Sequence, residues 1–225
     1  MDIDSKLYDG LLFYFILTIL SGYLYTLMNY LAHAYLSFNQ PEILAGNMVS
    51  DFVKGKKKFE YPPGIQKGIE LHRAIDEFTD NHPATKNAKE FFRQDYRLYS
   101  GAFIDIVYDH FLANDKNEFA DETALKLFSA GTYSLLQNNS AALPEQFNNM
   151  FYYMKKDDWL YNYRFIPGIE KSFNGLVRRA AYLTDSITAG RIFVLNYHSL
   201  EACYYDFFPG LKNFAVSRFQ QLIKN

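Results

Sequence analysis

The chain is poor in the residues that mark several common classes of protein. Its single cysteine, Cys203, excludes an intramolecular disulfide framework and a thiolate-based zinc site, and it fits a reducing cytoplasm. The formal net charge is only −2, which argues against a basic protein that coats nucleic acid, and we expect no nucleic-acid partner. The sequence has no glycine-rich phosphate loop, nucleophile elbow or zinc-finger spacing. Any catalytic chemistry must therefore come from other residue types.

Aromatic residues, by contrast, are abundant: they make up 18% of the chain, with 21 Phe and 19 Tyr against one Trp. Tyrosine adds packing area and keeps a polar tip, so the composition indicates a dense interior with many partly buried hydroxyl groups. The hydrophobic and charged fractions, 49% and 21%, are ordinary for a globular protein. A chain of 225 residues is long enough for one sizeable core, and nothing in the composition indicates two domains.

The N-terminal residues 1–27 differ from the rest. An apolar run at positions 11–27 approaches the ~20 residues of a membrane span. The leader before it has three aspartates against one lysine, where a signal peptide has a positive region. Three interpretations stay open: an extension upstream of a protein that begins at Met28, a membrane anchor, or a core helix. We expect membrane contact only if the run is an anchor, and we treat residues 28–225 as one domain.

From Met28 onward the apolar residues follow the helical period nearly throughout, with no β-alternating runs. Helices are predicted at residues 28–38, 39–55, 65–80, 82–96, 97–116, 121–139, 143–163, 168–183 and 190–223. Breaks are predicted at Pro167, Gly190 and Pro209–Gly210. We expect Asn39 to cap the second helix, with Pro41 in its first turn, and Asp80 or Asn81 to cap the fourth. The predicted fold class is all-α, a single helical-bundle domain.

Three of these helices carry polar pairs at i, i+4 spacing, which places both members of a pair on one face. The pairs are Asn47 and Asp51, His72 and Asp76, and Asp105 and Asp109, and His110 follows the last pair directly. Most of these carboxylates stand in apolar runs, and burying an ionised group costs several kcal/mol unless something compensates it. Solvation or helix capping would explain any one pair. Three pairs together favour a shared metal or catalytic cluster.

Carboxylates and imidazoles without thiolates are ligands for Mn²⁺, Mg²⁺, Fe²⁺ or Zn²⁺. Such an ion polarises a phosphoryl oxygen and activates water, and Arg73 is suited to neutralise phosphate charge. The lysine loop, Lys54, Lys56, Lys57 and Lys58, is either a solvated loop or a surface that attracts an acidic macromolecule. Two histidines receive structural interpretations: His82 at a helix start and His198 as core packing. For Arg178 and Arg179 two interpretations stay open, a second phosphate contact or a surface pair, and we favour the surface pair.

The segments "MNYLAHAYLS", "LAGNMVSDFVKG", "GIELHRAIDEFTDNHP" and "IDIVYDHFLA" resemble the acyl carrier protein phosphodiesterase family, as does "DWLYNYRFIPGIEKSFNGLVRRA". The similarity spans Met28 to about Phe219. It implies a Mn²⁺-dependent hydrolase that removes 4′-phosphopantetheine from holo-acyl carrier protein, and a helical fold distantly similar to HD-type metal phosphohydrolases. Asp109-His110 stands in the reverse order of the His-Asp dyad of those enzymes. Family members begin at the residue that matches Met28, which favours the extension.

The combined hypothesis gives each candidate residue a role. One or two metal ions are bound by Asp51, His72, Asp76, Asp109 and His110. Arg73 offsets developing charge, Asp105 orients a histidine or the water, and His33 is a candidate acid for the departing serine oxygen. The carrier protein is contacted by Asn47, Lys54, Lys56, Lys57 and Lys58, because acyl carrier proteins are acidic.

Competing hypotheses are a metal phosphohydrolase acting on a nucleotide or another small phosphodiester, and a helical module that binds acyl carrier protein without cutting it. A membrane-anchored helical protein is a third possibility that depends on residues 11–27.

Overall fold

The computed structural model describes residues 29–224, and over this range the chain is helical with no strand. Its α-helices are α2 (Tyr30–Tyr35), α3 (Pro41–Val49), α4 (Pro63–Asn81), α5 (Pro83–Tyr96), α6 (Ser100–Asn114), α7 (Glu122–Asn138), α8 (Glu145–Lys156), α9 (Trp159–Asn162), α10 (Ile166–Arg179), α11 (Ile187–Leu195) and α12 (Tyr197–Lys224). Short 3₁₀ helices are η1 (Ser50–Phe52), η2 (Gly55–Glu60), η3 (Arg97–Tyr99) and η4 (Ser140–Ala142). The predicted all-α class is confirmed.

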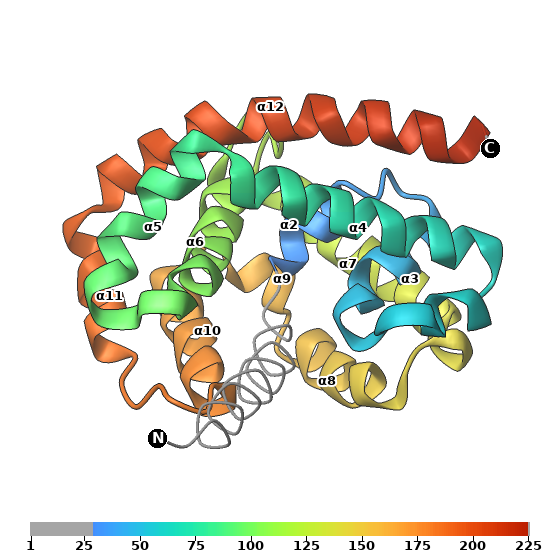
Figure 1. Ribbon diagram of the computed structural model, residues 1–225, viewed down its shortest axis with the longest axis horizontal. Coiled ribbons are helices and arrows are strands. Elements are labelled where there is room, and N and C mark those ends of the chain that lie inside the picture. Colours follow the sequence, from blue (N-terminus) through green and yellow to red (C-terminus); the bar gives the residue numbers. More distant parts are fainter. Residues whose placement is uncertain (1–28, 225) are drawn as a thin grey trace, which may run out of the picture.

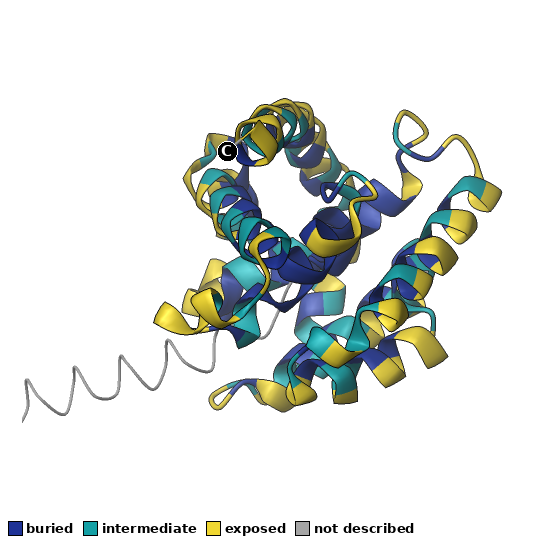
Figure 2. Ribbon diagram, turned by 90° about the vertical axis from the view of Figure 1, so that its right-hand side faces the viewer, coloured by how far each residue is buried: buried dark blue, intermediate teal, exposed yellow. Residues whose placement is uncertain are grey.

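The long helix α12 runs along one side of the molecule, and α4 and α5 pack beneath it (Figure 1). Below these, α6 packs against α5, α10 and α12, while α3 packs against α4 and α7. The short helix α2 lies centrally, in contact with α3 and α6. Buried residues lie on the helix faces turned toward one another and exposed residues on the outer faces (Figure 2).

Aromatic rings fill the contacts between helices, as the composition indicates. Phe92, Phe103 and Phe173 bring α5, α6 and α10 together, with ring centroids 5.2 to 6.3 Å apart. Tyr108 of α6 stacks on Phe207 of α12 at 5.0 Å. Such pairs add about 0.5–1.5 kcal/mol beyond the area they bury, so the aromatic contacts fix how the helices cross.

Two glycines allow α3 and α4 to pack backbone against backbone. A Cβ at Gly46 would lie 2.0 Å from the carbonyl oxygen of Ile65, and one at Gly68 would lie 2.3 Å from the carbonyl oxygen of Ile43. Only glycine fits at such a crossing. The close approach brings the polar residues of α3 and α4 within reach of one another.

Several predicted helix ends are wrong. The second helix ends at Val49 rather than Gly55, because the chain tightens into η1 and Gly55 then adopts φ +56°. Gln40, not Asn39, is the N-cap residue of α3, since Asn39 lies at φ +55° in the preceding turn. Pro41 in the first turn is confirmed.

The cap of α5 is His82, whose Nδ1 accepts a hydrogen bond from Ala84 N at 3.2 Å. The prediction of Asp80 or Asn81 is therefore wrong, and Asp80 instead pairs with Lys89 at 2.6 Å. The structural interpretation of His82 agrees with this geometry.

The predicted breaks at Gly190 and Pro209–Gly210 are also wrong, because α11 and α12 continue through them. Pro209 lies on the exposed side of α12, and the carbonyl group it leaves without a helical partner belongs to exposed Tyr205, where water can reach it. His198 is not in the core: its side chain is 94% exposed and lies 3.5 Å from Glu201.

The predictions for residues 1–27 lie outside the described residues. No helix within residues 29–224 is long and apolar enough to cross a membrane.

Candidate metal and active site

Two buried histidines meet a carboxylate whose side chain is 47% exposed, so the cluster opens to the surface on the side of that carboxylate. His33 lies on α2, and His72 and Asp76 lie one turn apart on α4. The two imidazole rings are almost fully buried and stack with centroids 4.0 Å apart. One oxygen of Asp76 lies 3.2 Å from His33 Nε2, and the other lies 3.0 Å from His72 Nε2. The carboxylate therefore spans both rings.

The ring nitrogens at this point lack regular partners. His33 Nε2 and His72 Nε2 are both buried, and each lies within hydrogen-bond distance of an Asp76 oxygen. The angles of these two contacts, however, depart from those of a regular hydrogen bond. Donor atoms of the three residues all lie within 4.8 Å of one another. Buried polar atoms are nearly always hydrogen-bonded, so converging imidazole nitrogens without a partner need a reason. A divalent cation is one, because imidazole and carboxylate are its usual donors.

Asn47 of α3 determines which nitrogen of His33 faces this point. Its Nδ2 donates to the carbonyl oxygen of His33 at 2.9 Å and to Ser37 Oγ at 3.1 Å. Its Oδ1 must then be the acceptor for His33 Nδ1, 2.7 Å away. The proton of neutral His33 therefore sits on Nδ1, and the lone pair on Nε2 faces His72 and Asp76.

Asp51, in η1, adds a second carboxylate. Its Oδ1 lies 3.4 Å from His72 Nε2, and its side chain is 12% exposed. The exposed Arg73 ties this segment to α4, because its Nη2 donates to the carbonyl oxygen of Val53 at 3.1 Å. The cationic side chain of Arg73 is thus anchored two residues from Asp51.

The charges of the cluster are strongly coupled. Burial alone lowers the pKa of His72, but the carboxylates of Asp76 and Asp51 outweigh burial and raise this pKa to about 10. Burial lowers the pKa of His33, and the neighbouring His72 lowers it further. Burial raises the pKa of Asp76, yet the two histidines outweigh it and hold this pKa well below its usual range. Without a metal, the cluster therefore holds one proton tightly, on His72.

Asp105 lies near enough to the cluster for the charge of Asp76 to act on its pKa. Its side chain is partly exposed, and its pKa lies well above the usual range because of desolvation and the nearby charges of Asp76 and Asp80. Asp105 is thus a carboxyl group that keeps its proton at higher pH than an ordinary aspartate.

Asp109 lies outside the cluster, although it shares a helix face with Asp105. It is fully buried, and its two oxygens accept hydrogen bonds from the backbone N–H groups of Leu31 and Ala32, each at 2.9 Å. These N–H groups belong to the first turn of α2 and have no partner within that helix. Asp109 therefore anchors the helix that carries His33.

His110 also points elsewhere, since the next residue along a helix lies about 100° around the axis. Its Nδ1 donates to the carbonyl oxygen of Tyr163 at 2.8 Å, and its Nε2 accepts from the hydroxyl group of Tyr197 at 3.0 Å. Both ring nitrogens are occupied, and the ring packs against Phe111 and Phe193. The structure does not bring His110 to the other candidate ligands.

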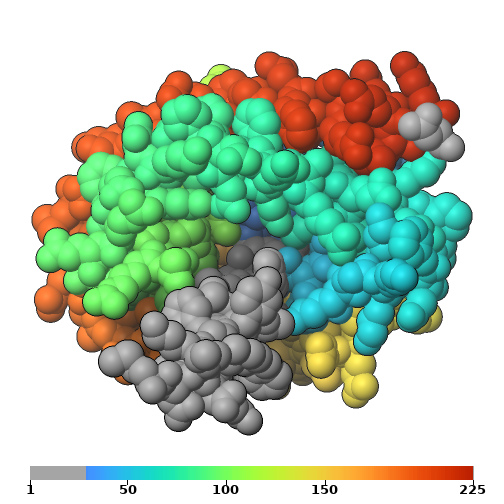
Figure 3. Space-filling model, viewed as in Figure 1, coloured from blue at the N-terminus to red at the C-terminus, as the bar shows by residue number. Residues whose placement is uncertain are grey.

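The lysine loop lies on the surface in and beside η2, within the cyan region on the right of the face in Figure 3. Lys54, Lys56 and Lys57 are exposed, while Lys58 pairs with Glu70 at 2.9 Å. The ring of Phe59 in the same segment is 65% exposed. The loop is therefore a cationic surface with one apolar side chain.

The sequence assigned His33 as an acid and Asn47 as a contact of the carrier protein. It did not indicate the central position of His33, or that Asn47 is fully buried and orients the His33 ring. A signal was present, because His33 is the one polar residue of the short apolar segment "YLAHAYL". Spacing within a helix cannot show that this residue meets a pair on another helix.

The fold and the cluster together define an all-α protein with a buried candidate metal site of imidazoles and carboxylates. The chain belongs to the acyl carrier protein phosphodiesterase family, whose model matches residues 28–211.

Curated relatives agree with this assignment. The chain is 31% identical over 191 residues to "Acyl carrier protein phosphodiesterase" of Pectobacterium atrosepticum, covering 85% of this chain and 99% of that protein. The proteins of the same name from Salmonella dublin and Escherichia coli O6:H1 are 31% and 30% identical over 182 residues, 81% of this chain and 94% of each relative. No solved structure matches the chain, so the likeness to HD-type phosphohydrolases stays a prediction.

Proposed function

We propose that this protein is a metal-dependent phosphodiesterase that hydrolyses holo-acyl carrier protein to 4′-phosphopantetheine and the apo protein, in the cytoplasm. Family membership supports the substrate. The observation that carries the metal dependence is the pair of buried Nε2 atoms, on His33 and His72, that converge with the carboxylate of Asp76 within 4.8 Å of one another. In the reaction, water adds to phosphorus while the bond from phosphorus to the serine oxygen breaks.

The residues that would hold the cation are His33, His72, Asp76 and Asp51. Mn²⁺ is the ion we favour from the family resemblance, and the donor set also suits Mg²⁺, Fe²⁺ or Zn²⁺. A divalent cation bound there would supply positive charge that polarises a phosphoryl oxygen and makes a water molecule more acidic.

The remaining residues position the cluster and move protons. Asn47 holds the Nε2 lone pair of His33 toward the cluster, which suits a ligand and does not suit the acid role expected from the sequence. We assign the acid role to Asp105 instead, because its raised pKa lets it keep a proton for the departing serine oxygen. Arg73 is anchored beside Asp51 and can offset charge on the phosphate.

The lysine loop supplies the docking surface in this proposal. Lys54, Lys56 and Lys57 present positive charge near the segment that holds Asp51, and an acidic carrier protein would be steered toward it. Phe59 adds an apolar contact on the same surface.

Incubation of the full chain with Mn²⁺ and holo-acyl carrier protein, followed by intact-protein mass spectrometry, tests the proposal. We expect the carrier to lose its phosphopantetheine arm, and His72→Ala to abolish the loss. His198→Ala removes an exposed histidine away from the cluster and serves as the matched control. Parallel incubation with a nucleotide phosphodiester tests the alternative substrate. Turnover of the nucleotide without loss of the arm would refute our assignment.

A further inference from the structure

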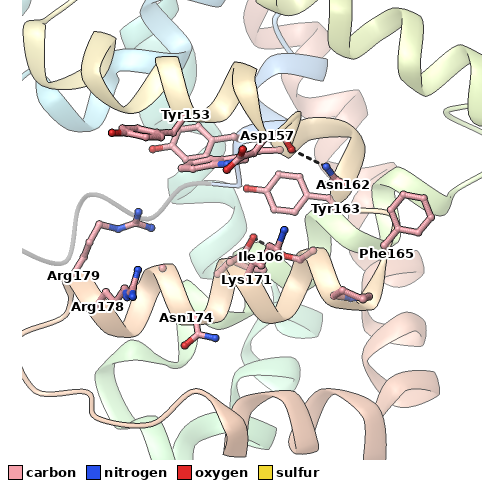
Figure 4. A pocket seen from close by; sticks show the side chains of 16 residues that line it. Ile106, Tyr153, Asp157, Asn162, Tyr163, Phe165, Lys171, Asn174, Arg178 and Arg179 are labelled. Carbon is pink, nitrogen blue, oxygen red and sulfur yellow. Dashed lines mark hydrogen bonds between the residues drawn. The ribbon is translucent and has the colours of Figure 1, made fainter.

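A cavity of about 760 Å³ opens between α8, α9 and α10 (Figure 4). Aromatic side chains form much of its wall, among them Tyr153, Trp159, Tyr163 and Phe165. Its volume falls within the roughly 300–1,000 Å³ of small-molecule sites. The cavity is thus large enough for an organic ligand.

The cavity reaches the neighbourhood of the metal cluster through two residues. Tyr30 lines it and lies one turn before His33 on α2, and Ile106 lines it and follows Asp105 on α6. Burial raises the pKa of Tyr30, the charge of Asp51 raises it further, and the charge of Arg179 lowers it. The hydroxyl group of Tyr30 is therefore coupled electrostatically to Asp51 of the cluster and to Arg179 of the cavity.

The α10 side of the cavity is cationic. Lys171, Arg178 and Arg179 line it, and none of them forms an ion pair with another residue of the described part of the chain. Arg179 projects from α10 toward the side of α8, and Asp157 on the opposite wall is the carboxylate of the lining (Figure 4). The backbone carbonyl of Asp157 accepts a hydrogen bond from Asn162 Nδ2 at 2.7 Å. Such a surface favours an anionic ligand.

We propose that this cavity binds the 4′-phosphopantetheine arm of the substrate. The inference rests on the proposed function, because it identifies where the phosphopantetheine product of that reaction is held. The arm carries a phosphate at one end, then a dimethyl-substituted carbon and methylene groups between two amides. The phosphate of the arm is the group attacked at the cluster, so it lies at the end of the cavity lined by Tyr30, where Arg179 offsets its charge. The aromatic wall matches the apolar part of the arm. Asn162 supplies amide hydrogen-bonding groups for the arm.

Gly175 of α10 offers a way to fill the cavity without damage to the fold. It lines the cavity, and a Cβ there meets only the side chain of Arg179, at an ordinary 3.6 Å. The control is Gly131 of α7, which is exposed and where a Cβ meets nothing within 4 Å. The substitutions Gly175→Leu and Gly131→Leu add the same side chain to a helical glycine, inside and outside the cavity.

Trp159, the single tryptophan of the chain, lines the cavity and reports binding directly. Titration of the metal-free full chain with 4′-phosphopantetheine is expected to change its fluorescence in a saturable way. Gly131→Leu should bind equally well, Gly175→Leu should not bind, and Arg179→Gln should bind more weakly. Absence of binding to the unmodified chain, or equal binding by the two leucine variants, overturns the proposal.

Catalysis gives a second test that separates this site from the cluster. With holo-acyl carrier protein, kcat/KM of Gly175→Leu should fall about a hundredfold relative to Gly131→Leu. Hydrolysis of bis(4-nitrophenyl) phosphate, a diester without the arm, should be equal in the two variants. Equal kcat/KM on the carrier overturns the cavity proposal and leaves the proposed function intact. If Gly175→Leu loses binding of 4′-phosphopantetheine and the unmodified chain does not cleave holo-acyl carrier protein, the proposed function is refuted and the cavity proposal is supported.

Discussion

At the scale of single residues, the amide of Asn47 sets the direction of the His33 lone pair. We expect Asn47→Leu to weaken Mn²⁺ binding by about 10–100-fold, the usual cost of losing a group that orients a ligand. Calorimetric titration with Mn²⁺ measures this. Asn148→Leu is the control, because the amide of Asn148 binds backbone carbonyl groups of Ser140 and Leu143 at 3.0 and 3.2 Å, in another part of the fold. Equal Mn²⁺ affinities in the two variants would contradict the orienting role.

The raised pKa of His72 makes the metal-free protein sensitive to alkaline pH. Burial lowers this pKa, but Asp76 and Asp51 raise it to about 10, above the roughly 6.5 of an unfolded histidine. Its contribution to stability is therefore complete below about pH 6.5 and disappears as the pH rises through about 10. In EDTA, the free energy of unfolding of the unmodified protein should decrease across this window. The free energy of unfolding of His72→Gln should not show this decrease, because glutamine does not titrate.

Urea unfolding of both proteins near neutral pH and near pH 9.5 checks this, since the difference between them should shrink at the higher pH. If the difference in free energy of unfolding between the two proteins is the same at both pH values, the pKa of His72 is not raised in the folded protein. With Mn²⁺ present the trend should reverse, because the cation and the proton compete for the same nitrogen.

At the scale of elements, α2 depends on Asp109 for its position. Asp109→Asn leaves at least one of the N–H groups of Leu31 and Ala32 without an acceptor, and we expect a loss of about 1–3 kcal/mol in the free energy of unfolding. Urea unfolding measures this loss. Mn²⁺ affinity of the folded variant should change far less than in His72→Ala. An affinity loss as large as that of His72→Ala would make Asp109 a ligand after all.

The crossing of α3 and α4 gives a second prediction at this scale. Gly68→Ala places a Cβ 2.3 Å from the carbonyl oxygen of Ile43, so the helices must separate, at a cost of about 1–3 kcal/mol or more. Gly131→Ala, in open space on α7, should instead stabilise the protein by up to about 1 kcal/mol. Chemical denaturation of both variants decides, and a neutral Gly68→Ala would contradict the backbone contact.

Periodicity predicted the helices well, and it failed where a terminus or a break depends on surroundings. Pro209 does not end α12, because its ring and the carbonyl group it releases face solvent. His82 caps α5 in place of the stronger capping residue Asp80, which is engaged with Lys89. The tertiary structure decides which side of a helix faces water and which partner a side chain contacts. Local sequence patterns therefore cannot predict either.

At the scale of the whole molecule, the same limit applies to the site. The i, i+4 pattern predicted His72 and Asp76 as a pair on one face, and the structure places both at the cluster. It could not distinguish this pair from Asp105 and Asp109, of which the second turns to the backbone of α2. Membership of the cluster depends on how α2, α3 and α4 pack, and the glycine contact of α3 with α4 is visible only in three dimensions.

Because the cluster joins α2, η1 and α4, metal binding should stabilise the entire fold. Mn²⁺ at a hundred times its dissociation constant should raise the free energy of unfolding by about 2.7 kcal/mol, because only the folded chain brings the four donors together. EDTA should remove this increment, and His33→Ala and His72→Ala should not show it. His198→Ala, which alters an exposed side chain, should retain it. Thermal unfolding with and without Mn²⁺ measures the increment, and an equal Mn²⁺-dependent shift in His72→Ala would place the ion elsewhere in the protein.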